Sequence, residues 1–368
     1  MAAYARRGGS GGAAADDHPT DPGPVSFMRA TIGFDEIVGQ LVCPEHRRAL
    51  RVAPDGCLSA GVPCPDGTLS CPEGCEYPVR GGVPRFTGRG HYANAFGLQW
   101  RRYPKTQLDS YTGQPISRDR LESCLGMKLD RLAGLKVLEC GSGAGRFTEH
   151  LAGHGETLVS LDISDAVDAN LKNCGGKFPY LLMQADVNRA PLPRGYFDVC
   201  LCLGVLQHTP SPGETVVHLV EHLKPGGLLA IDHYTRRPGP LGVGQYLTLA
   251  VPIRAVLKRL PPEAGLRATI ALTAVCDPVR RYTCRVKWLD RVVSRLLPSM
   301  CYYQQFPQLD PRVAYEWNEL DTHDYLTDYY QYRKSPEQVE AMLTGLGMEV
   351  LHCRRGGNGV EALARKPG

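Results

Sequence analysis

The chain has 368 residues, enough for one large domain and a smaller one or for two domains. Hydrophobic residues make up 43% of the chain and charged residues 22%, so most of it can bury a globular core. The net charge of +4 is too small to indicate a nucleic-acid partner such as DNA, and the sequence contains no run of apolar residues suited to span a bilayer.

The N-terminal segment has almost nothing to bury. Residues 1–27 are rich in Gly, Ala, Asp and Pro, and this composition predicts a disordered tail. No apolar signal-peptide core follows Met1, and many of the 14 Cys lie in apolar runs, as Cys200 and Cys202 do. Such thiols act as small hydrophobes in a reducing compartment. We therefore expect a cytoplasmic protein without a disulfide framework.

Residues 28–88 combine short apolar runs with Cys, Pro and Gly. Cys43-Pro-Glu-His46 and Cys71-Pro-Glu-Gly-Cys75 each place two soft ligands on a tight turn, as a tetrahedral zinc site requires. With the segment that follows, they resemble a small zinc-ribbon family in which both pairs are usually Cys-x-x-Cys. We expect a structural zinc bound by Cys43, His46, Cys71 and Cys75. The alternatives are ligand sets that include Cys57 or Cys64, and a ribbon that holds no metal.

Residues 89–132 are polar and aromatic, with helical patches. They contain Ala95–Trp100, Lys105–Asp109 and Ile116–Arg118. Aromatic and Arg side chains just before the first strand of a core commonly lie over a bound cofactor. We interpret this segment as a linker with lid helices, and simple packing explains it equally well.

Residues 133–234 alternate short β-branched runs with helical patterns, as βαβ units do. The first predicted strand, Leu135–Glu139, ends in a carboxylate and leads into Gly141, Gly143 and Gly145. Glycines at a strand-to-helix turn let a ligand lie against the backbone. The spacing is not that of a dinucleotide fingerprint, because Arg146 and Phe147 stand where its last Gly would be.

The following predicted strands also end in carboxylates. Leu158–Asp162 places one 21 residues after Gly141, where it can accept both hydroxyls of a ribose. Leu181–Asp186 ends in an Asp placed to meet an adenine amino group. Two further strands are expected at Phe197–Gly204 and Leu228–Asp232.

Residues 235–334 interrupt this pattern and are mostly helical by periodicity. The part from 235 to 300 is strongly basic, which fits an anionic substrate such as a nucleotide-linked or phospholipid-linked sugar, or simply a solvated helical face. One stripe in this part recurs at helical spacing and predicts core or lid packing: Val286, Leu289, Val292, Val293, Leu296 and Leu297.

Residues 335–368 resume the α/β pattern. Ser335-Pro336-Glu337 has the form of a helix start, with a capping residue followed by proline. Two strands, Met348–Arg354 and Gly359–Ala364, are joined by a Gly-rich turn that is typical of an antiparallel hairpin.

This ordered set of motifs resembles the class I S-adenosylmethionine-dependent methyltransferases, over residues 133–234 and 335–368. The resemblance implies a Rossmann-like α/β fold whose seven-stranded sheet has the order 3-2-1-4-5-7-6, with strand 7 antiparallel and a helical insertion between strands 5 and 6. It implies S-adenosylmethionine as the cofactor, bound by Glu139, Gly141, Gly143, Gly145, Asp162, Ile163, Asp186, Val187 and Leu203. The alternative is an α/β domain whose acidic strand ends only cap helices.

The acceptor side is less defined. His208, Asp232 and His233 follow the fourth and fifth strands, where an α/β sheet opens its ligand crevice, so each is a candidate general base. His208 can instead shape the loop beside the cofactor. Trp317, Asp321 and Asp324 belong to an acidic cluster that can reach an acceptor hydroxyl or merely cap a helix.

Motifs of the linker, with Trp317 and Gly356–Gly359, resemble a ribbon-bearing subgroup of these methyltransferases found among sugar and natural-product genes. We therefore expect O-methylation of a small sugar-containing or natural-product acceptor. An RNA base methyltransferase is the first alternative, although the ribbon lacks a stripe of aromatic and basic residues. A binding module without catalysis is the second, and the intact Glu139, Asp162 and Asp186 argue against it. The sequence leaves the acceptor atom and the oligomeric state open.

Overall fold

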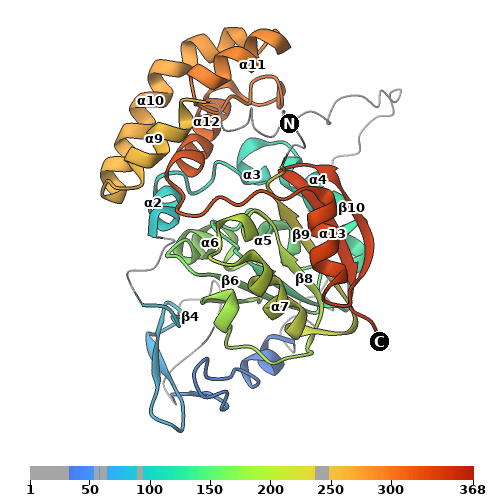
Figure 1. Cartoon of the computed structure of the whole chain (residues 1–368). Helices are drawn as coiled ribbons and strands as arrows, with labels where there is room; N and C mark the ends of the chain where they lie inside the picture. Colours follow the sequence, from blue (N-terminus) through green and yellow to red (C-terminus); the bar gives the residue numbers. More distant parts are fainter. Residues whose placement is uncertain (1–32, 54–57, 59–63, 89–93, 237–247) are drawn as a thin grey trace.

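The computed structural model describes residues 33–53, 58, 64–88, 94–236 and 248–368. The predicted tail, residues 1–27, lies outside this part of the chain. Figure 1 shows a small sheet at the bottom, a central sheet flanked by helices, and a group of helices at the top. No helix among the described residues is long and apolar enough to cross a membrane.

The small sheet lies within the predicted ribbon. Its strands pair antiparallel in the order β1-β2-β3-β4, so each strand neighbours the next one along the chain. The turn between the second and third strands carries Cys71 and Cys75. The strands are β1 (Arg51–Val52), β2 (Gly67–Ser70), β3 (Glu76–Arg80) and β4 (Val83–Pro84).

The central sheet has seven strands in the order β7-β6-β5-β8-β9-β11-β10. The five strands from β5 to β9 pair in parallel, and β11 is antiparallel to both of its neighbours. The predicted order and the antiparallel seventh strand are thus confirmed. The strands are β5 (Lys136–Cys140), β6 (Thr157–Asp162), β7 (Leu181–Gln184), β8 (Phe197–Cys202), β9 (Leu223–His233), β10 (Glu349–Gly356) and β11 (Gly359–Arg365).

Most of these bounds lie within two residues of the prediction, and two of the differences have a local cause. Strand β9 begins at Leu223 rather than at Leu228, because Leu223 pairs with Phe197 ahead of a shift in register. Strand β7 ends two residues before Asp186, which instead starts a short 3-10 helix. Both differences lie at strand ends, where local turns compete with the ladder.

Both faces of the central sheet are buried, which explains why its parallel strands are apolar almost throughout. Alternate residues of a strand point to opposite faces. Leu138 therefore joins one apolar cluster and its neighbour Val137 the other. Helices α4 (Ile116–Leu125), α5 (Thr148–Leu151) and α6 (Val167–Cys174) cover one face, and α7 (Pro212–His222) and α13 (Pro336–Thr344) cover the other. At α13, Ser335 and Gln338 form a capping box, so the predicted helix start is confirmed.

The small sheet shares its core with the central one. Leu69 and Val79 are buried in the same apolar cluster as Leu181 of β7. The backbone N–H of Phe86 donates to the carbonyl of Gln184 at 2.8 Å, so the chain after β4 extends the sheet edge at β7. The ribbon is therefore packed on the methyltransferase-like core and is not a tethered module.

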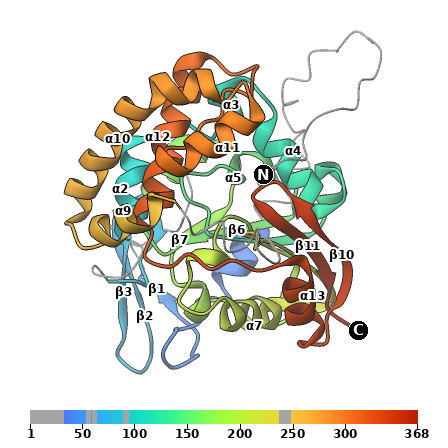
Figure 2. The ribbon, with the colours of Figure 1, turned by 45° about the horizontal axis from the view of Figure 1, so that its top comes forward.

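The insertion of residues 235–334 is mostly helical where it is described, as predicted, with irregular segments at 297–310 and 328–334. Tyr234 and Lys334 meet at its base, where the Lys334 N–H donates to the Tyr234 carbonyl at 2.9 Å. Its helices form one group beside α2 (Figure 2), and α12 packs against both α10 and α2. They are α9 (Ala250–Leu257), α10 (Pro262–Thr283), α11 (Lys287–Leu296) and α12 (Pro311–Thr327). The remaining short elements are α2 (Asn94–Arg102), α3 (Asp109–Thr112), η1 (Leu129–Leu132), η2 (Val187–Arg189) and η3 (Leu206–His208).

Candidate cofactor and acceptor site

The turn after β5 is built so that only glycine fits. Gly141, Gly143 and Gly145 all have positive φ, a conformation that side chains rarely adopt. A Cβ on Gly141 would lie 2.1 Å from the Val205 side chain, and a Cβ on Gly143 would lie 3.3 Å from the ring of Trp100. The loop after β8 and helix α2 therefore both press against this turn. The linker prediction placed Trp100 in the lid, and its ring lies over Gly143.

Glu139 lies beneath the glycine turn, buried in β5. One carboxylate oxygen accepts hydrogen bonds from the hydroxyls of Thr148 and Ser160, both at 2.6 Å. Its other oxygen is buried without a hydrogen-bond partner among the described residues. Burial raises the pKa of Glu139 to about 7, although the two hydroxyls oppose this. This site can therefore receive a further donor or cation.

Asp162 ends β6 beside the same turn. One of its oxygens accepts from the Gly143 N–H at 2.9 Å, and the other accepts from the N–H and the hydroxyl of Ser164 at 2.8 and 2.6 Å. Asp186 caps η2 by accepting from the Asn188 N–H at 2.9 Å. The other predicted cofactor residues, Ile163, Val187 and Leu203, follow β6, β7 and β8. The structure thus brings the predicted cofactor set to one edge of the sheet, as the resemblance implies.

Asp232 is held in a buried ion pair. It accepts from the Gly204 N–H at 2.6 Å and pairs with the Arg120 guanidinium of α4. A carboxylate occupied in this way anchors the loop after β8 to α4. The neighbouring His233 points to the opposite face of β9, where burial lowers its pKa to about 4.

His208 connects the loop after β8 to α12. Its Nδ1 lies 2.8 Å from a carboxylate oxygen of Asp328, and its Nε2 lies 3.9 Å from one of Asp324. Although burial opposes the charged form, Asp324 and Asp328 raise the pKa of His208 to about 9. The imidazole is therefore protonated near neutral pH and cannot act as a base there.

Two carboxylates of α12, Asp324 and Asp321, are half-buried. Asp324 accepts from the Tyr234 hydroxyl at 3.2 Å, and burial raises its pKa to about 7. Asp321 accepts from the Tyr302 hydroxyl at 2.5 Å and from the Trp317 indole at 3.2 Å, and burial raises its pKa as well. These residues lie inside α12, so the interpretation of the acidic cluster as a helix cap is wrong.

Arg146 joins the glycine turn to this acidic face. Its Nη1 donates to the side-chain oxygen of Gln107 at 3.1 Å, and the Gln107 amide donates to Asp321 at 3.1 Å. The guanidinium also lies over the Trp317 ring, 5.4 Å from its centroid. The segment after the glycine turn is thus linked to Asp321 through two hydrogen bonds.

Four residues of this site were missed from the sequence: Arg120, Arg146, Tyr234 and Tyr302. Arg146 was noted only because it breaks a dinucleotide pattern, and Tyr234 directly follows two candidate residues. Arg120 and Tyr302 carry no local signal, since each acquires its role from partners that are distant in the sequence.

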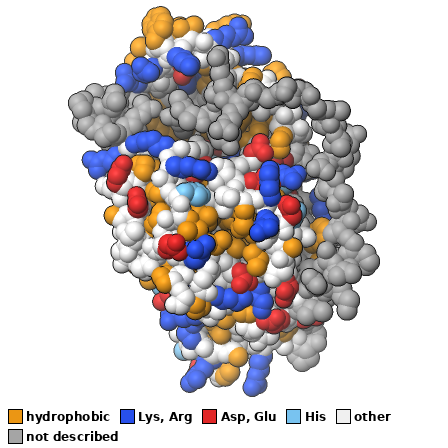
Figure 3. All heavy atoms as spheres, turned by 90° about the vertical axis from the view of Figure 1, so that its right-hand side faces the viewer, with side chains coloured by type: hydrophobic (Ala, Val, Ile, Leu, Met, Phe, Trp, Pro, Cys, Tyr) orange, Lys and Arg blue, Asp and Glu red, His pale blue; other side chains and the backbone are white. Residues whose placement is uncertain are grey.

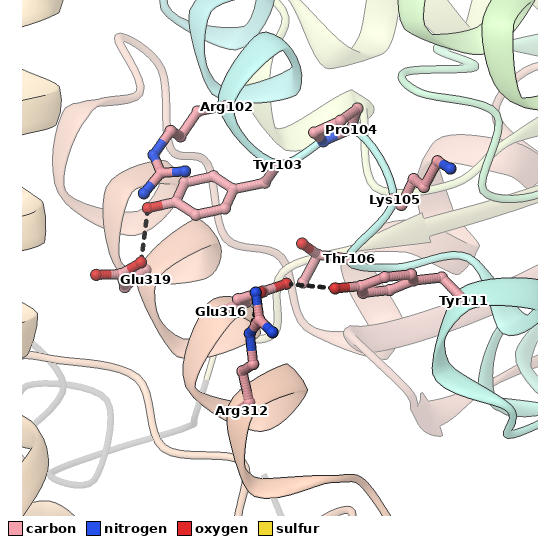
Figure 4. Close-up of a pocket in the computed structure, with 9 residues that line it drawn as sticks. All are labelled: Arg102, Tyr103, Pro104, Lys105, Thr106, Tyr111, Arg312, Glu316 and Glu319. Carbon is pink, nitrogen blue, oxygen red and sulfur yellow. Dashed lines mark hydrogen bonds and ion pairs between the residues drawn. The ribbon is translucent and has the colours of Figure 1, made fainter.

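A hollow of about 310 Å³ lies on another side of α12. Figure 4 shows Tyr103 and Tyr111 bonded there to Glu319 and Glu316 at 2.9 and 3.1 Å. Glu319 and Asp324 are five residues apart on a helix of 3.6 residues per turn, so they point to different sides. The hollow lies close to the glycine turn on this other side, because the Asn173 amide donates both to the carbonyl of its lining residue Pro104 and to the Ala144 carbonyl, at 2.7 and 2.8 Å.

The ribbon brings its four predicted metal ligands together. The Sγ atoms of Cys43, Cys71 and Cys75 lie 3.7, 3.7 and 3.5 Å from the Nδ1 of His46. Sulfur and nitrogen ligands of a tetrahedral zinc are separated by roughly 3.6 Å, given Zn–S and Zn–N bonds of about 2.3 and 2.0 Å. Cys43, His46 and Cys71 therefore form a compact group that can hold an ion, since their ligand atoms all lie within 4.8 Å of one another, and Cys75 lies beside His46. Cys64 is disulfide-bonded and is not available as a ligand, and Cys57 lies outside the described residues.

Comparison with known proteins agrees with this geometry. Residues 138–231 match a family model described as a methyltransferase domain. This segment is a class I S-adenosylmethionine-dependent methyltransferase domain. The match covers β5 to β9, the strands whose carboxyl ends carry the predicted cofactor residues.

The chain is also similar to curated methyltransferases. Ubiquinone biosynthesis O-methyltransferase from Thiobacillus denitrificans is 34% identical over 134 residues, which are 35% of this chain and 55% of that protein. The protein of the same name from Dechloromonas aromatica is 29% identical over a segment of the same length. The chain therefore spans about half the length of the curated relatives it matches.

Solved structures of methyltransferases are similar at a lower level. One from Methanosarcina mazei has a TM-score of 0.37 and 14% identity, covering 64% of this chain and 93% of its own. One described as a putative methyltransferase, from Bacillus halodurans, has a TM-score of 0.40 and 12% identity, covering 67% and 99%. The assignment of the domain rests on the sequence match and the sheet order.

The raised pKa of His208 predicts how stability depends on pH. Unfolded His has a pKa near 6.5, so the His208 ion pairs stabilise the fold fully below that pH and are lost as the pH rises toward 9. The difference in free energy of unfolding between the wild type and His208→Gln should shrink by up to roughly 3 kcal/mol over this range. Urea unfolding at a series of pH values measures it. A difference independent of pH would contradict the ion pairs.

Proposed function

We propose that the protein is an S-adenosylmethionine-dependent O-methyltransferase acting on a small acceptor of the sugar or natural-product type. The position and the raised pKa of Asp324 are the main support for the proposal. Asp324 is a half-buried carboxyl with a pKa raised to about 7, on an insertion helix that contacts the glycine turn through Arg146 and Gln107. A group with a pKa near the working pH suits the removal of a proton from a hydroxyl.

The residues at the sheet edge fit the cofactor. The glycine turn offers backbone free of Cβ atoms, and Glu139 has a buried oxygen without a partner in the described structure. Glu139 and the turn would hold the methionine part, Asp162 the ribose, and Asp186 with Val187 the adenine. When bound, S-adenosylmethionine supplies a methyl group on a sulfonium centre. The side chains of this protein hold it, orient the acceptor and move the acceptor proton.

The geometry also supports a division of roles. Methyl transfer needs an in-line approach and an acceptor that has lost its proton. Asp324 would take up the proton of the acceptor. The protonated His208, 3.9 Å away, favours the ionised form of Asp324, which can accept this proton. Trp317, Tyr302 and Asp321 form a wall with apolar rings and one carboxylate, suited to orient a ring that bears hydroxyls.

O-methylation is further supported by the curated relatives, whose names specify O-methyltransferase activity on a small molecule. The sugar or natural-product class rests on the resemblance to the ribbon-bearing subgroup alone. A cytoplasmic location is proposed with it, in keeping with buried free thiols such as Cys200 and Cys202. The disulfide bond of Cys64 is the one feature of the described residues that a reducing compartment disfavours.

The cofactor assignment predicts that Asp162→Ala weakens binding of S-adenosylmethionine. Each hydrogen bond to a charged group contributes about 1.5–3 kcal/mol, so loss of the carboxylate should raise the Kd at least about tenfold. Titration calorimetry measures this change. Asp198→Ala is the matched control, because Asp198 bonds the Lys136 N–H and the Lys224 ammonium, away from the glycine turn. No binding of S-adenosylmethionine by the wild type, with Asp162→Ala no different, would favour the module without catalysis.

The acceptor assignment predicts that Asp324→Asn lowers kcat by about 10²- to 10⁴-fold with cofactor affinity unchanged, because the amide cannot take up a proton. The assay is transfer of label from S-adenosylmethionine with a labelled methyl group into molecules of a cell extract. The wild-type rate should rise with pH through about 7, where Asp324 ionises. Glu316→Gln, on another side of α12, is the control. Full activity of Asp324→Asn would exclude this role.

We also propose that the ribbon binds one structural zinc through Cys43, His46, Cys71 and Cys75. The predicted result is about one zinc per chain by elemental analysis, and clearly less in Cys71→Ser. Removal of the metal by a chelator should lower the melting temperature of the wild type. Cys284→Ser, in the insertion, should keep its zinc. A chain purified without zinc that neither takes it up nor gains stability from it would show that the ribbon is held by packing.

A further inference from the structure

Helix α11 exposes two parallel rows of opposite character. Lys287, Arg291 and Arg295 form a basic row, and each is followed by a residue of an apolar row: Trp288, Val292 and Leu296. The apolar side chains are 66%, 48% and 58% exposed, and no residue of α11 is buried. Residues at intervals of four lie along one side of a helix, so the two rows run side by side. The predicted core packing of this stripe is therefore wrong for Val286, Val292 and Leu296, which are exposed.

The same surface continues onto neighbouring helices. On α10, which packs against α11, the side chains of Val275, Val279 and Tyr282 are exposed, Val275 by 75%. The Leu249 N–H, just before α9, donates to the Arg295 carbonyl at 2.8 Å, and both Leu249 and Val251 are exposed. In Figure 3, hydrophobic side chains stand beside Lys and Arg at the top of the molecule, where Figure 1 places α10 and α11.

Positive charge on this surface is not neutralised from within. Asp290 is the one acid of α11, and it pairs with Arg280 at 2.7 Å. Asp277 of α10 is buried and accepts hydrogen bonds from Tyr303 and Asn318. In the part of the chain that the structure describes, none of Lys287, Arg291 and Arg295 pairs with a carboxylate. The exposed face is therefore both apolar and strongly basic.

We propose that this face of α10 and α11 binds the surface of a membrane that contains anionic lipid. Apolar side chains with a Trp can enter the boundary between headgroups and acyl chains, while an adjoining basic row contacts lipid phosphates. Because no described helix could cross a bilayer, the contact is with the surface. This inference is independent of the methyl acceptor and would hold for an inactive chain.

The charge pattern favours lipid over two other occupants. A second copy of the chain, paired through the same face, would bring unpaired basic rows together at a cost in repulsion. An RNA would use the basic row but would leave the exposed Val and Leu side chains without an apolar partner. An anionic lipid surface satisfies both rows at once.

The test measures binding of the full-length protein to vesicles of phosphatidylcholine alone or mixed with phosphatidylglycerol. Cosedimentation should show at least about tenfold stronger partition onto the anionic vesicles, weakened by added salt. Tryptophan emission should shift to shorter wavelength on binding. Trp288→Phe should abolish this shift, because Trp317 is buried and Trp100 is packed on the glycine turn.

Two double variants test the apolar row and the basic row separately. Val292→Glu with Leu296→Glu should reduce partition at least about tenfold, and Arg291→Glu with Arg295→Glu should remove the preference for anionic vesicles. Val217→Glu, which replaces a 39% exposed residue on α7, should bind as the wild type does. Unchanged S-adenosylmethionine affinity in each variant shows that the fold is retained.

Several results would overturn the proposal. These are equal partition of the wild type onto both vesicle types, unaltered partition of both double variants, or a dimer in light scattering that Val292→Glu with Leu296→Glu dissolves. Affinity for RNA that exceeds affinity for anionic vesicles, and that is lost with the basic row, would do the same. Failure here leaves the methyltransferase proposal untouched, because Asp162→Ala and Asp324→Asn test a different region.

Discussion

The close contact of backbone at the glycine turn is the constraint on which the site depends. The N–H groups of Gly141 and Ser142 both donate to the Leu161 carbonyl, at 2.7 and 3.0 Å, and Gly143 donates to Asp162. Val205 presses on the same turn from the loop after β8. Three parallel strands are thereby held together at their carboxyl ends. A side chain at Gly141 would displace Val205 and, with it, the loop that carries His208.

The charged side chains of the site form ion pairs that have different roles. Arg120 and Asp232 are buried together, and removing one partner of such a pair typically costs about 3–5 kcal/mol. His208 faces two carboxylates, of which Asp328 also pairs with Arg254. Asp324 is therefore the carboxyl beside His208 that loses its proton near neutral pH. The ion pairs fix the surrounding segments, and two carboxyls can change their charge near neutral pH: Asp324 here and Glu139 below the glycine turn.

The sequence predicted what is encoded locally. The capping box at Ser335 and the turns at the cofactor edge follow from short motifs, whereas the strand order came from the family resemblance, because paired strands such as β9 and β11 are distant in the chain. The link from Arg146 through Gln107 to Asp321 could not be predicted, because it joins three segments that meet only after folding. The early start of β9 escaped prediction because Lys224–Gly227 has the composition of a turn. The stripe on α11 has the periodicity of a packed helix, and periodicity alone cannot say which side meets solvent.

The base of the insertion has a consequence for how such a protein can change. The insertion leaves the sheet after Tyr234 and returns at Lys334, and these two residues are bonded to each other. The insertion of about one hundred residues therefore leaves and rejoins the sheet at one place, and its length does not affect the strand order of the sheet. The part that faces the acceptor can be exchanged or enlarged over generations while the cofactor edge stays as it is. The same sheet can thus serve new acceptors when the insertion alone is replaced.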